Sequence, residues 1–110
     1  MSEVLIVLSN CPDAGTAERI GRHLVEQGLA ACVNQLAPVS SCYRWQGAVE
    51  TATEVPLLIK TTRERYPELE AAIRQLHPYD LPEIVAWPLA NGYGPYLRWV
   101  AAECSPRLVA

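Results

Sequence analysis

The N-terminal part of the chain shows a pattern of apolar positions that predicts a strand followed by a helix. Val4–Leu8 is a continuous apolar run, which is typical of a strand covered on both faces. Asp13 is suited to capping the helix that follows, and Gly28 is suited to the left-handed position just after its end. Between them, apolar or small residues recur at helical spacing, at Ala17, Ile20, Gly21, Leu24 and Val25.

The middle of the chain predicts a long hairpin. Leu29–Val33 resumes an extended apolar pattern, which continues through to Trp45. Gln46–Gly47 is suited to a tight two-residue turn, and the return strand is expected over Ala48–Thr61.

The C-terminal half predicts two further helices and a strand. Pro67 stands near the first turn of the second helix, whose apolar face is expected to consist of Leu69, Ala72, Ile73 and Leu76. A strand follows at Ile84–Trp87. After a connection rich in glycine and proline (Pro88–Pro95), a short closing helix is expected over Tyr96–Cys104.

The predicted order is therefore β-α-β-β-α-β followed by a helix. This is the split βαβ arrangement of ferredoxin-like domains, an α+β sandwich with a sheet on one side and two helices on the other. With 110 residues, the chain is expected to form a single domain over 1–110.

The predicted hairpin is longer than the body that carries it. Strands of about 13 residues span roughly 43 Å, whereas a compact domain of this length is only about 34 Å across. Pro38 is expected almost opposite Pro56, so both strands lose a ladder donor at one level and bend there. The tip, residues 39–55, then becomes an arm with Tyr43 and Trp45 on one face. An exposed flexible arm would leave these rings in water, so we expect it to lie on a neighbouring subunit.

Composition and charge narrow the classes of partner. The net charge of −3 argues against nucleic acid or an anionic membrane as the main partner. No signal-like or membrane-spanning apolar run is present, so a cytoplasmic protein is expected. The four cysteines form no C-x-x-C pair and are expected to be free thiols.

The segment Leu76–Ile84 is the strongest candidate for a site. Its two prolines stiffen the loop, which carries the imidazole of His77, the phenol of Tyr79 and the carboxylates of Asp80 and Glu83. His77 is either a hydrogen-bonding residue that ends the helix or a ligand for copper or zinc. In the second case the thiolate of Cys32 or Cys11 would complement it, although Cys32 also suits plain burial in a strand.

Other polar groups leave alternatives open. Lys60 either extends to solvent, pairs with Glu83 or holds an anion. Tyr79 either buries its ring or lines a cleft. No nucleophile can be paired with a base, and neither a phosphate-binding glycine loop nor a zinc-protease motif is present, so an enzyme is not expected.

Several motifs together resemble the CutA family of divalent-cation-tolerance proteins, nearly from end to end and in the family order. They are Leu29–Asn34 (LAACVN), Ser41–Gly47 (SCYRWQG), Leu58–Thr61 (LIKT), His77–Tyr79 (HPY) with Pro82–Ile84 (PEI), and Gly94–Trp99 (GPYLRW).

The resemblance implies a ferredoxin-like fold assembled as a homotrimer similar to that of the PII signal-transduction proteins, with each hairpin reaching onto the adjacent subunit. It also implies cytoplasmic metal-ion tolerance, with copper as the main ion; zinc is the possible second ion, from the chemistry of the imidazole. His77 and Cys32 match the histidine and cysteine of the family motifs. The residues expected in the cleft between subunits are Lys60, Tyr79, Glu83 and Trp45, and those expected at the trimer interface are Tyr43, Trp45 and Trp99.

The chain also departs from the family pattern. Some bacterial members have a cysteine where this chain has Ser9 and a second histidine where it has Leu76. Cys11 follows Ser9 by two residues and shares its face only while the strand stays regular. The alternative to metal binding is a regulatory scaffold of the PII type, which would bind a small molecule or a protein in the cleft.

Overall fold

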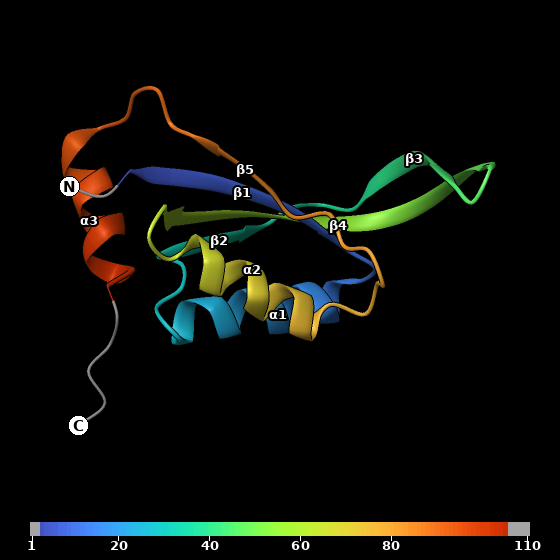
Figure 1. Cartoon of the computed structure of the whole chain (residues 1–110), viewed down its shortest axis with the longest axis horizontal. Helices are drawn as coiled ribbons and strands as arrows, with labels where there is room; N and C mark the ends of the chain where they lie inside the picture. Colours follow the sequence, from blue (N-terminus) through green and yellow to red (C-terminus); the bar gives the residue numbers. More distant parts are fainter. Residues whose placement is uncertain (1–2, 106–110) are drawn as a thin grey trace.

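The computed structural model describes residues 3–105 and has one sheet with two helices against it (Figure 1). The strand order is β2-β4-β1-β5, and β3 pairs with the first half of β4. All neighbouring strands run antiparallel. The elements in chain order are β1 (Val4–Cys11), α1 (Ala14–Glu26), β2 (Cys32–Gln35), β3 (Val39–Trp45), β4 (Ala48–Thr62), α2 (Tyr66–Leu76), β5 (Val85–Pro88) and α3 (Gly94–Glu103).

The main core lies between the sheet and helices α1 and α2. Alternate residues of β1 and β4 face these helices, as the period of two along a strand requires. Val100 of α3 and Cys104, the residue just after its end, pack separately, on Val4 at one end of the sheet. The predicted ferredoxin-like α+β fold with a closing helix is therefore confirmed. Among residues 3–105, no helix is long and apolar enough to cross a membrane.

Most local signals mark the element ends correctly. The Asp13 side chain accepts a hydrogen bond from the Thr16 N–H at 2.7 Å, and Gly28 takes the left-handed φ of 68°. The second strand was predicted three residues too early: the N–H groups of Leu29 and Ala30 both donate to the Leu24 carbonyl and close α1, so β2 begins at Cys32.

Other details also differ from the prediction, among them β5, which runs from Val85 to Pro88 and not from Ile84 to Trp87. β1 continues to Cys11, because it pairs with β4 over its whole length. Leu76, predicted on the buried face of α2, is the last residue of the helix and is exposed. α3 begins at Gly94 because Pro95 fits its first turn.

The arm, defined as β3 and residues 48–54 of β4, extends beyond the ends of α1 and α2 (Figure 1). The molecule measures 46 × 34 × 23 Å, so its long axis exceeds the diameter expected for a compact body. Gln46 (φ 50°) and Gly47 (φ 82°) form the turn, as predicted, with the two positive φ angles of a type I′ hairpin.

The bend at the base of the arm lies in the outgoing strand alone. Gln35 pairs with Leu57 and Val39 with Glu54, so the outgoing chain uses one residue more than β4 between these pairs, which is a β-bulge. β4 itself is continuous. The residue directly opposite Pro56 is Leu36, whose N–H donates to the Pro56 carbonyl at 2.9 Å, while Pro38, predicted almost opposite Pro56, precedes the Val39–Glu54 pair. Because Pro56 has no N–H, it cannot return a hydrogen bond to the Leu36 carbonyl, so this pair has one ladder bond and not two.

Candidate functional site

The loop between α2 and β5, residues 77–84, is called the His77 loop. It begins with an imidazole held by backbone groups on both sides. His77 is only 7% exposed, and its Nε2 lies 2.7 Å from the carbonyl oxygen of Asn10. The Tyr79 N–H donates to Nδ1 at 3.2 Å. A neutral ring with its proton on Nε2 satisfies both contacts. His77 therefore ties the end of α2 to β1, and a metal ion would have to displace one of these two bonds.

Two further hydrogen bonds hold the rest of this loop. The Tyr79 hydroxyl donates to Glu54 Oε2 at 3.1 Å, at the base of the arm, and Asn10 Nδ2 donates to Glu83 Oε1 at 3.1 Å. Burial, with Glu54 adding to it, raises the pKa of Tyr79 to about 12, so the phenol stays a donor at neutral pH. Asn10 and Glu54 were missed from the sequence, because their partners lie far away along the chain.

A cleft of about 630 Å³ lies between the arm and the His77 loop. We call it the arm cleft. Four carboxylates line it, together with two aromatic rings of the arm, and no Lys or Arg is among the described residues that do so. Its lining residues are Asn10, Ser41, Cys42, Tyr43, Trp45, Glu50, Glu54, Tyr79, Asp80, Leu81 and Glu83.

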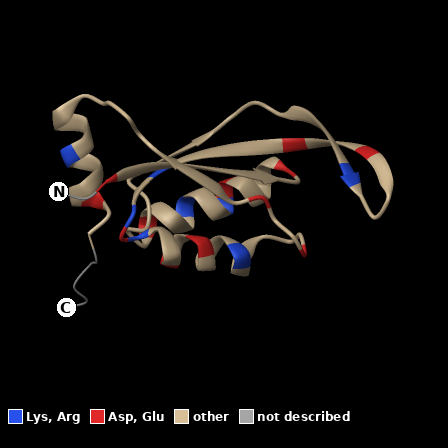
Figure 2. Ribbon diagram, turned by 45° about the horizontal axis from the view of Figure 1, so that its top comes forward, with Lys and Arg blue, Asp and Glu red and all other residues tan. Residues whose placement is uncertain are grey.

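The strand register explains why the cleft is acidic and aromatic. Tyr43 pairs with Glu50 and Trp45 with Ala48, so both rings and this carboxylate share one face of the arm, as predicted for the rings. Arg44, the one basic residue of the arm, pairs with Val49 on the opposite face. Figure 2 shows the charged positions along the arm and the loop.

Glu54 is the one buried carboxylate among the four that line the arm cleft. It is 8% exposed, its one hydrogen bond comes from Tyr79, and no Lys, Arg or His within residues 3–105 forms an ion pair with it. A buried carboxylate without a cationic partner is costly. The negative charge of the arm cleft is therefore compatible with a bound cation, including a metal ion.

The structure does not bring the three predicted metal ligands together. Cys11 lies next to Asn10, but burial, with Asp13 and Glu54 adding to it, raises the pKa of its thiol to about 11, so it is protonated at neutral pH. Cys32 pairs with Lys60, four residues from Pro56 at the level of Asn10, which is about 13 Å along the sheet. Within residues 3–105, no three His, Cys, Asp or Glu side chains could jointly hold an ion.

The residues predicted for the cleft between subunits fall into two places. Trp45, Tyr79 and Glu83 line the arm cleft, whereas Lys60 lies on the face of the sheet opposite α1 and α2. There the Lys60 ammonium contacts the Asn34 side-chain oxygen and lies 4.0 Å from Cys32 Sγ. Glu83 bonds to Asn10 and not to Lys60.

The face of the sheet opposite α1 and α2 carries exposed apolar side chains. Trp87 pairs with Ile6 and Val85 with Leu8, and both β5 side chains are about half exposed. Trp99 of α3 is 44% exposed and stacks on Tyr96, with ring centroids 5.5 Å apart. Exposed aromatic and aliphatic side chains of this kind are typical of interaction sites.

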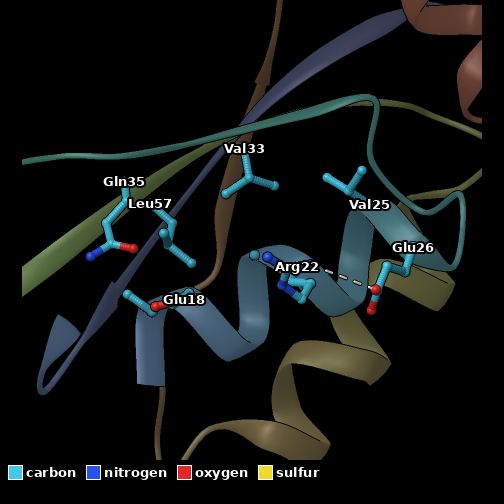
Figure 3. A pocket seen from close by; sticks show the side chains of 9 residues that line it. Glu18, Arg22, Val25, Glu26, Val33, Gln35 and Leu57 are labelled. Atoms are coloured by element: carbon cyan, nitrogen blue, oxygen red, sulfur yellow. Dashed lines mark ion pairs between the residues drawn. The ribbon is translucent and has the colours of Figure 1, made fainter. Parts of the chain in front are cut away.

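A second cavity of about 350 Å³ lies between α1 and β2 (Figure 3). Its floor is apolar, with Val33 and Leu57, and its rim carries the Arg22–Glu26 ion pair at 3.9 Å. It contains none of the residues predicted for a site, and its charges are already paired or exposed.

Comparison with known proteins agrees with the fold and the motifs. Residues 5–103 match the family model of the CutA1 divalent ion tolerance proteins. The divalent-cation tolerance protein CutA of Thermus thermophilus is 46% identical over 95 residues, which cover 86% of this chain and 92% of that protein.

Solved structures of CutA proteins also resemble this chain closely in fold and sequence. CutA from Xylella fastidiosa has a TM-score of 0.91 at 44% identity, covering 94% of this chain and 100% of that one. The periplasmic divalent cation tolerance protein CutA of Archaeoglobus fulgidus has a TM-score of 0.90 at 33% identity, covering 93% and 99%. The chain thus belongs to the CutA1 divalent ion tolerance protein family, whose members are tolerance proteins and not enzymes.

Proposed function

We propose that this protein is a cytoplasmic homotrimer that binds divalent metal ions, copper foremost and zinc second, and so contributes to metal-ion tolerance. The carrying observation is the buried carboxylate of Glu54, which has no cationic partner within residues 3–105 and opens into a cleft lined by Glu50, Asp80 and Glu83. A cation bound there would compensate these charges.

Copper is favoured by general coordination chemistry. Among divalent first-row ions, Cu²⁺ binds a given set of nitrogen and oxygen ligands most tightly. In this cleft the Glu54 carboxylate would hold it, with water or a sibling subunit completing the set. His77, Cys32 and Cys11 stay predicted ligands. His77 would have to release Asn10 or Tyr79, and the two thiols would have to act at separate sites or with ligands from a sibling.

A homotrimer is supported by the surface that one chain leaves uncovered. Tyr43 and Trp45 on the arm, Trp87 on β5 and Trp99 on α3 are each about 40–45% exposed. Burying such rings against a second copy gains free energy through the hydrophobic effect. The arm projects beyond its own body, so it can reach a sibling, as predicted from the length of the hairpin.

A cytoplasmic location is supported by the chemistry of the cysteines. All four are free in the described chain, which suits a reducing compartment. A periplasmic location, as for the relative from A. fulgidus, is the alternative. Fractionation of cells that produce the full chain distinguishes the two.

Calorimetric titration with Cu²⁺ and Zn²⁺ tests the metal proposal. Glu54→Gln keeps an acceptor for Tyr79 and removes only the charge, so we expect it to weaken Cu²⁺ binding about tenfold, as a lost charged ligand should. Glu18→Gln, which removes an equal charge on α1 outside the cleft, should have no effect. His77→Ala and Cys32→Ser report on the ligands predicted from the sequence. Identical Cu²⁺ affinity in wild type and all variants would exclude Glu54, His77 and Cys32 as Cu²⁺ ligands.

The alternative, a PII-like regulatory or scaffold protein, also has an observation in its favour. The arm cleft, at about 630 Å³, has the size of pockets that hold small molecules. A thermal-shift screen of metal-free protein with metabolite pools tests it, because a ligand that binds only the folded state raises the Tm.

A further inference from the structure

We propose that Cys32 and Lys60 form an oxidation-sensitive pair, in which hydrogen peroxide joins the thiol and the amine through a covalent sulfur–nitrogen bond, a sulfenamide. This modification goes beyond metal binding, since it needs neither a metal ion nor the arm cleft. It depends on three features: the cross-strand position of the two side chains, the contacts that hold the Lys60 amine in place, and the chemistry of an oxidised thiol.

Cys32 and Lys60 are directly opposite each other in the ladder between β2 and β4. Side chains in such a pair lie on the same face of the sheet, with Cβ atoms about 4.5–5.5 Å apart. Lys60 Nζ lies 4.0 Å from Cys32 Sγ. Lys60 is also the single lysine of the chain, so the only side-chain amine stands beside a thiol.

Asn34 holds the Lys60 amine at this position. Its side-chain oxygen contacts Nζ, and it shares a face with Cys32 because it lies two residues further along β2. Within residues 3–105, no carboxylate forms an ion pair with Lys60. No acidic group among these residues therefore competes with Cys32 for the amine.

The surroundings of the thiol suit a reaction with a small oxidant. Cys32 is free and half-buried. Burial, with the neighbouring Cys32 adding to it, raises the pKa of Tyr96, so this phenol keeps its proton at neutral pH and can supply it to a leaving hydroxide. Both reacting groups belong to one chain. The only co-reactant has about the size of a water molecule, so it can enter a cleft between subunits.

The reaction takes place in two balanced steps. In the first, Cys32 Sγ attacks one oxygen of hydrogen peroxide, the O–O bond breaks, a sulfenic acid forms and water leaves. In the second, the neutral Lys60 amine attacks this sulfur, as thiols and backbone nitrogens do: the S–N bond forms, the S–O bond breaks, and the hydroxide leaves as water with one amine proton. Sulfur is oxidised by two electrons, and one hydrogen peroxide is reduced to two water molecules.

The sulfenamide differs from the other oxidation products of a thiol because it is reversible. A thiol reductant attacks the sulfur, breaks the S–N bond and returns the amine, as in thiol–disulfide exchange. Sulfinic and sulfonic acids are not recovered in this way. The neighbouring lysine therefore protects Cys32 against irreversible oxidation.

Peptide mapping of the full-length protein tests the proposal. The protein is freed of metal on a chelating resin, treated with hydrogen peroxide, alkylated at its remaining thiols and digested with trypsin without reduction. Because trypsin does not cut after a modified lysine, we expect residues 23–44 linked to residues 45–63, with two hydrogen atoms fewer than the separate peptides. A thiol reductant should release the two peptides. Cys32 recovered unmodified, or only as sulfinic or sulfonic acid beside a free Lys60, would overturn the proposal.

Three conservative variants assign the crosslink to this pair. Lys60→Arg keeps the positive charge but removes the nucleophilic amine, so the crosslink should be absent and irreversible oxidation of Cys32 at least about tenfold greater, since an adjacent group reacts faster than a second peroxide. Cys32→Ser should also remove the crosslink. Cys42→Ser, at an exposed thiol in the same tryptic peptide, should keep it. A crosslink that persists in Cys32→Ser, or equal oxidation of Cys32 in Lys60→Arg and wild type, would contradict the pairing.

Discussion

The imidazole of His77 and the backbone carbonyl of Asn10 are joined by a hydrogen bond of 2.7 Å between residues 67 positions apart in the sequence. Asn10 also holds Glu83 through its side chain, so one residue of β1 fixes both ends of the loop that lines the arm cleft. The position of the loop, and with it the shape of the cleft, therefore depends on a buried neutral histidine.

Replacing His77 should therefore destabilise the protein. His77→Ala removes a buried ring, leaves the Asn10 carbonyl without its donor and leaves the Tyr79 N–H without its acceptor, so we expect the free energy of unfolding to fall by about 2–4 kcal/mol. Urea unfolding measures it. His23→Gln, in the last turn of α1, is the matched control, with an expected change below about 1 kcal/mol. Equal stability of His77→Ala and wild type would contradict this structural role.

The buried thiol of Cys11 should make stability fall at alkaline pH. Its pKa is raised from 9.0 to about 11 in the folded protein, so between these values the unfolded chain loses the thiol proton while the folded chain keeps it. The unfolded state then binds fewer protons, and the free energy of unfolding decreases with rising pH. The stability that the protonated Cys11 thiol contributes is fully present below pH 9 and is lost as the pH rises toward 11.

Comparison of unfolding at neutral pH and near pH 10 isolates this effect. We expect wild type to lose about 1–2 kcal/mol more than Cys11→Ala over this interval. Cys42→Ala, at an exposed position of the arm, should follow wild type. A Cys11→Ala variant with the same pH dependence as wild type would show that the thiol does not contribute.

The parts of the fold that were predicted correctly depend on local signals. Asp13, Gly28 and the Gln46–Gly47 turn act through their own backbone neighbours, so residue type and position suffice to identify them. The arm was predicted from the length of the hairpin. The bulge at residues 36–38 was not predicted, because strand register depends on the pairing partners.

The candidate site was predicted less well because it is built from distant contacts. The loop carrying His77 was recognised, but the hydrogen bond between Tyr79 and Glu54 joins residues 25 positions apart and has no local signature. For the same reason Lys60 and Cys32, both prominent in the family motifs, could not be separated from the arm cleft before the sheet register was known.

Ser9 offers a test of the core. Its hydroxyl is fully buried on the helix-facing side of β1 and has no hydrogen-bond partner among the described residues. Ser9→Ala removes an unsatisfied polar group, so we expect the free energy of unfolding to rise by about 1 kcal/mol. Thr61→Val is the matched control, because the equally buried Thr61 hydroxyl donates to the Leu29 carbonyl at 2.6 Å. That variant should lose about 1–2 kcal/mol, and a loss on Ser9→Ala as well would mean that the Ser9 hydroxyl is satisfied in solution.

Trp45 tests the assembly. Its ring lies on the same face of the arm as Tyr43 and is about 40% exposed in the single chain, so it has apolar surface to bury against a sibling. We expect wild type to sediment as a trimer at micromolar concentration and Trp45→Ala to shift toward smaller species, because truncating a central aromatic contact costs about 2 kcal/mol or more. Val49→Ala, on the opposite face of the arm and 65% exposed, should leave the sedimentation profile unchanged. A wild-type monomer under these conditions would contradict the homotrimer, and also the proposal that the arm extends past its own body in order to contact a sibling.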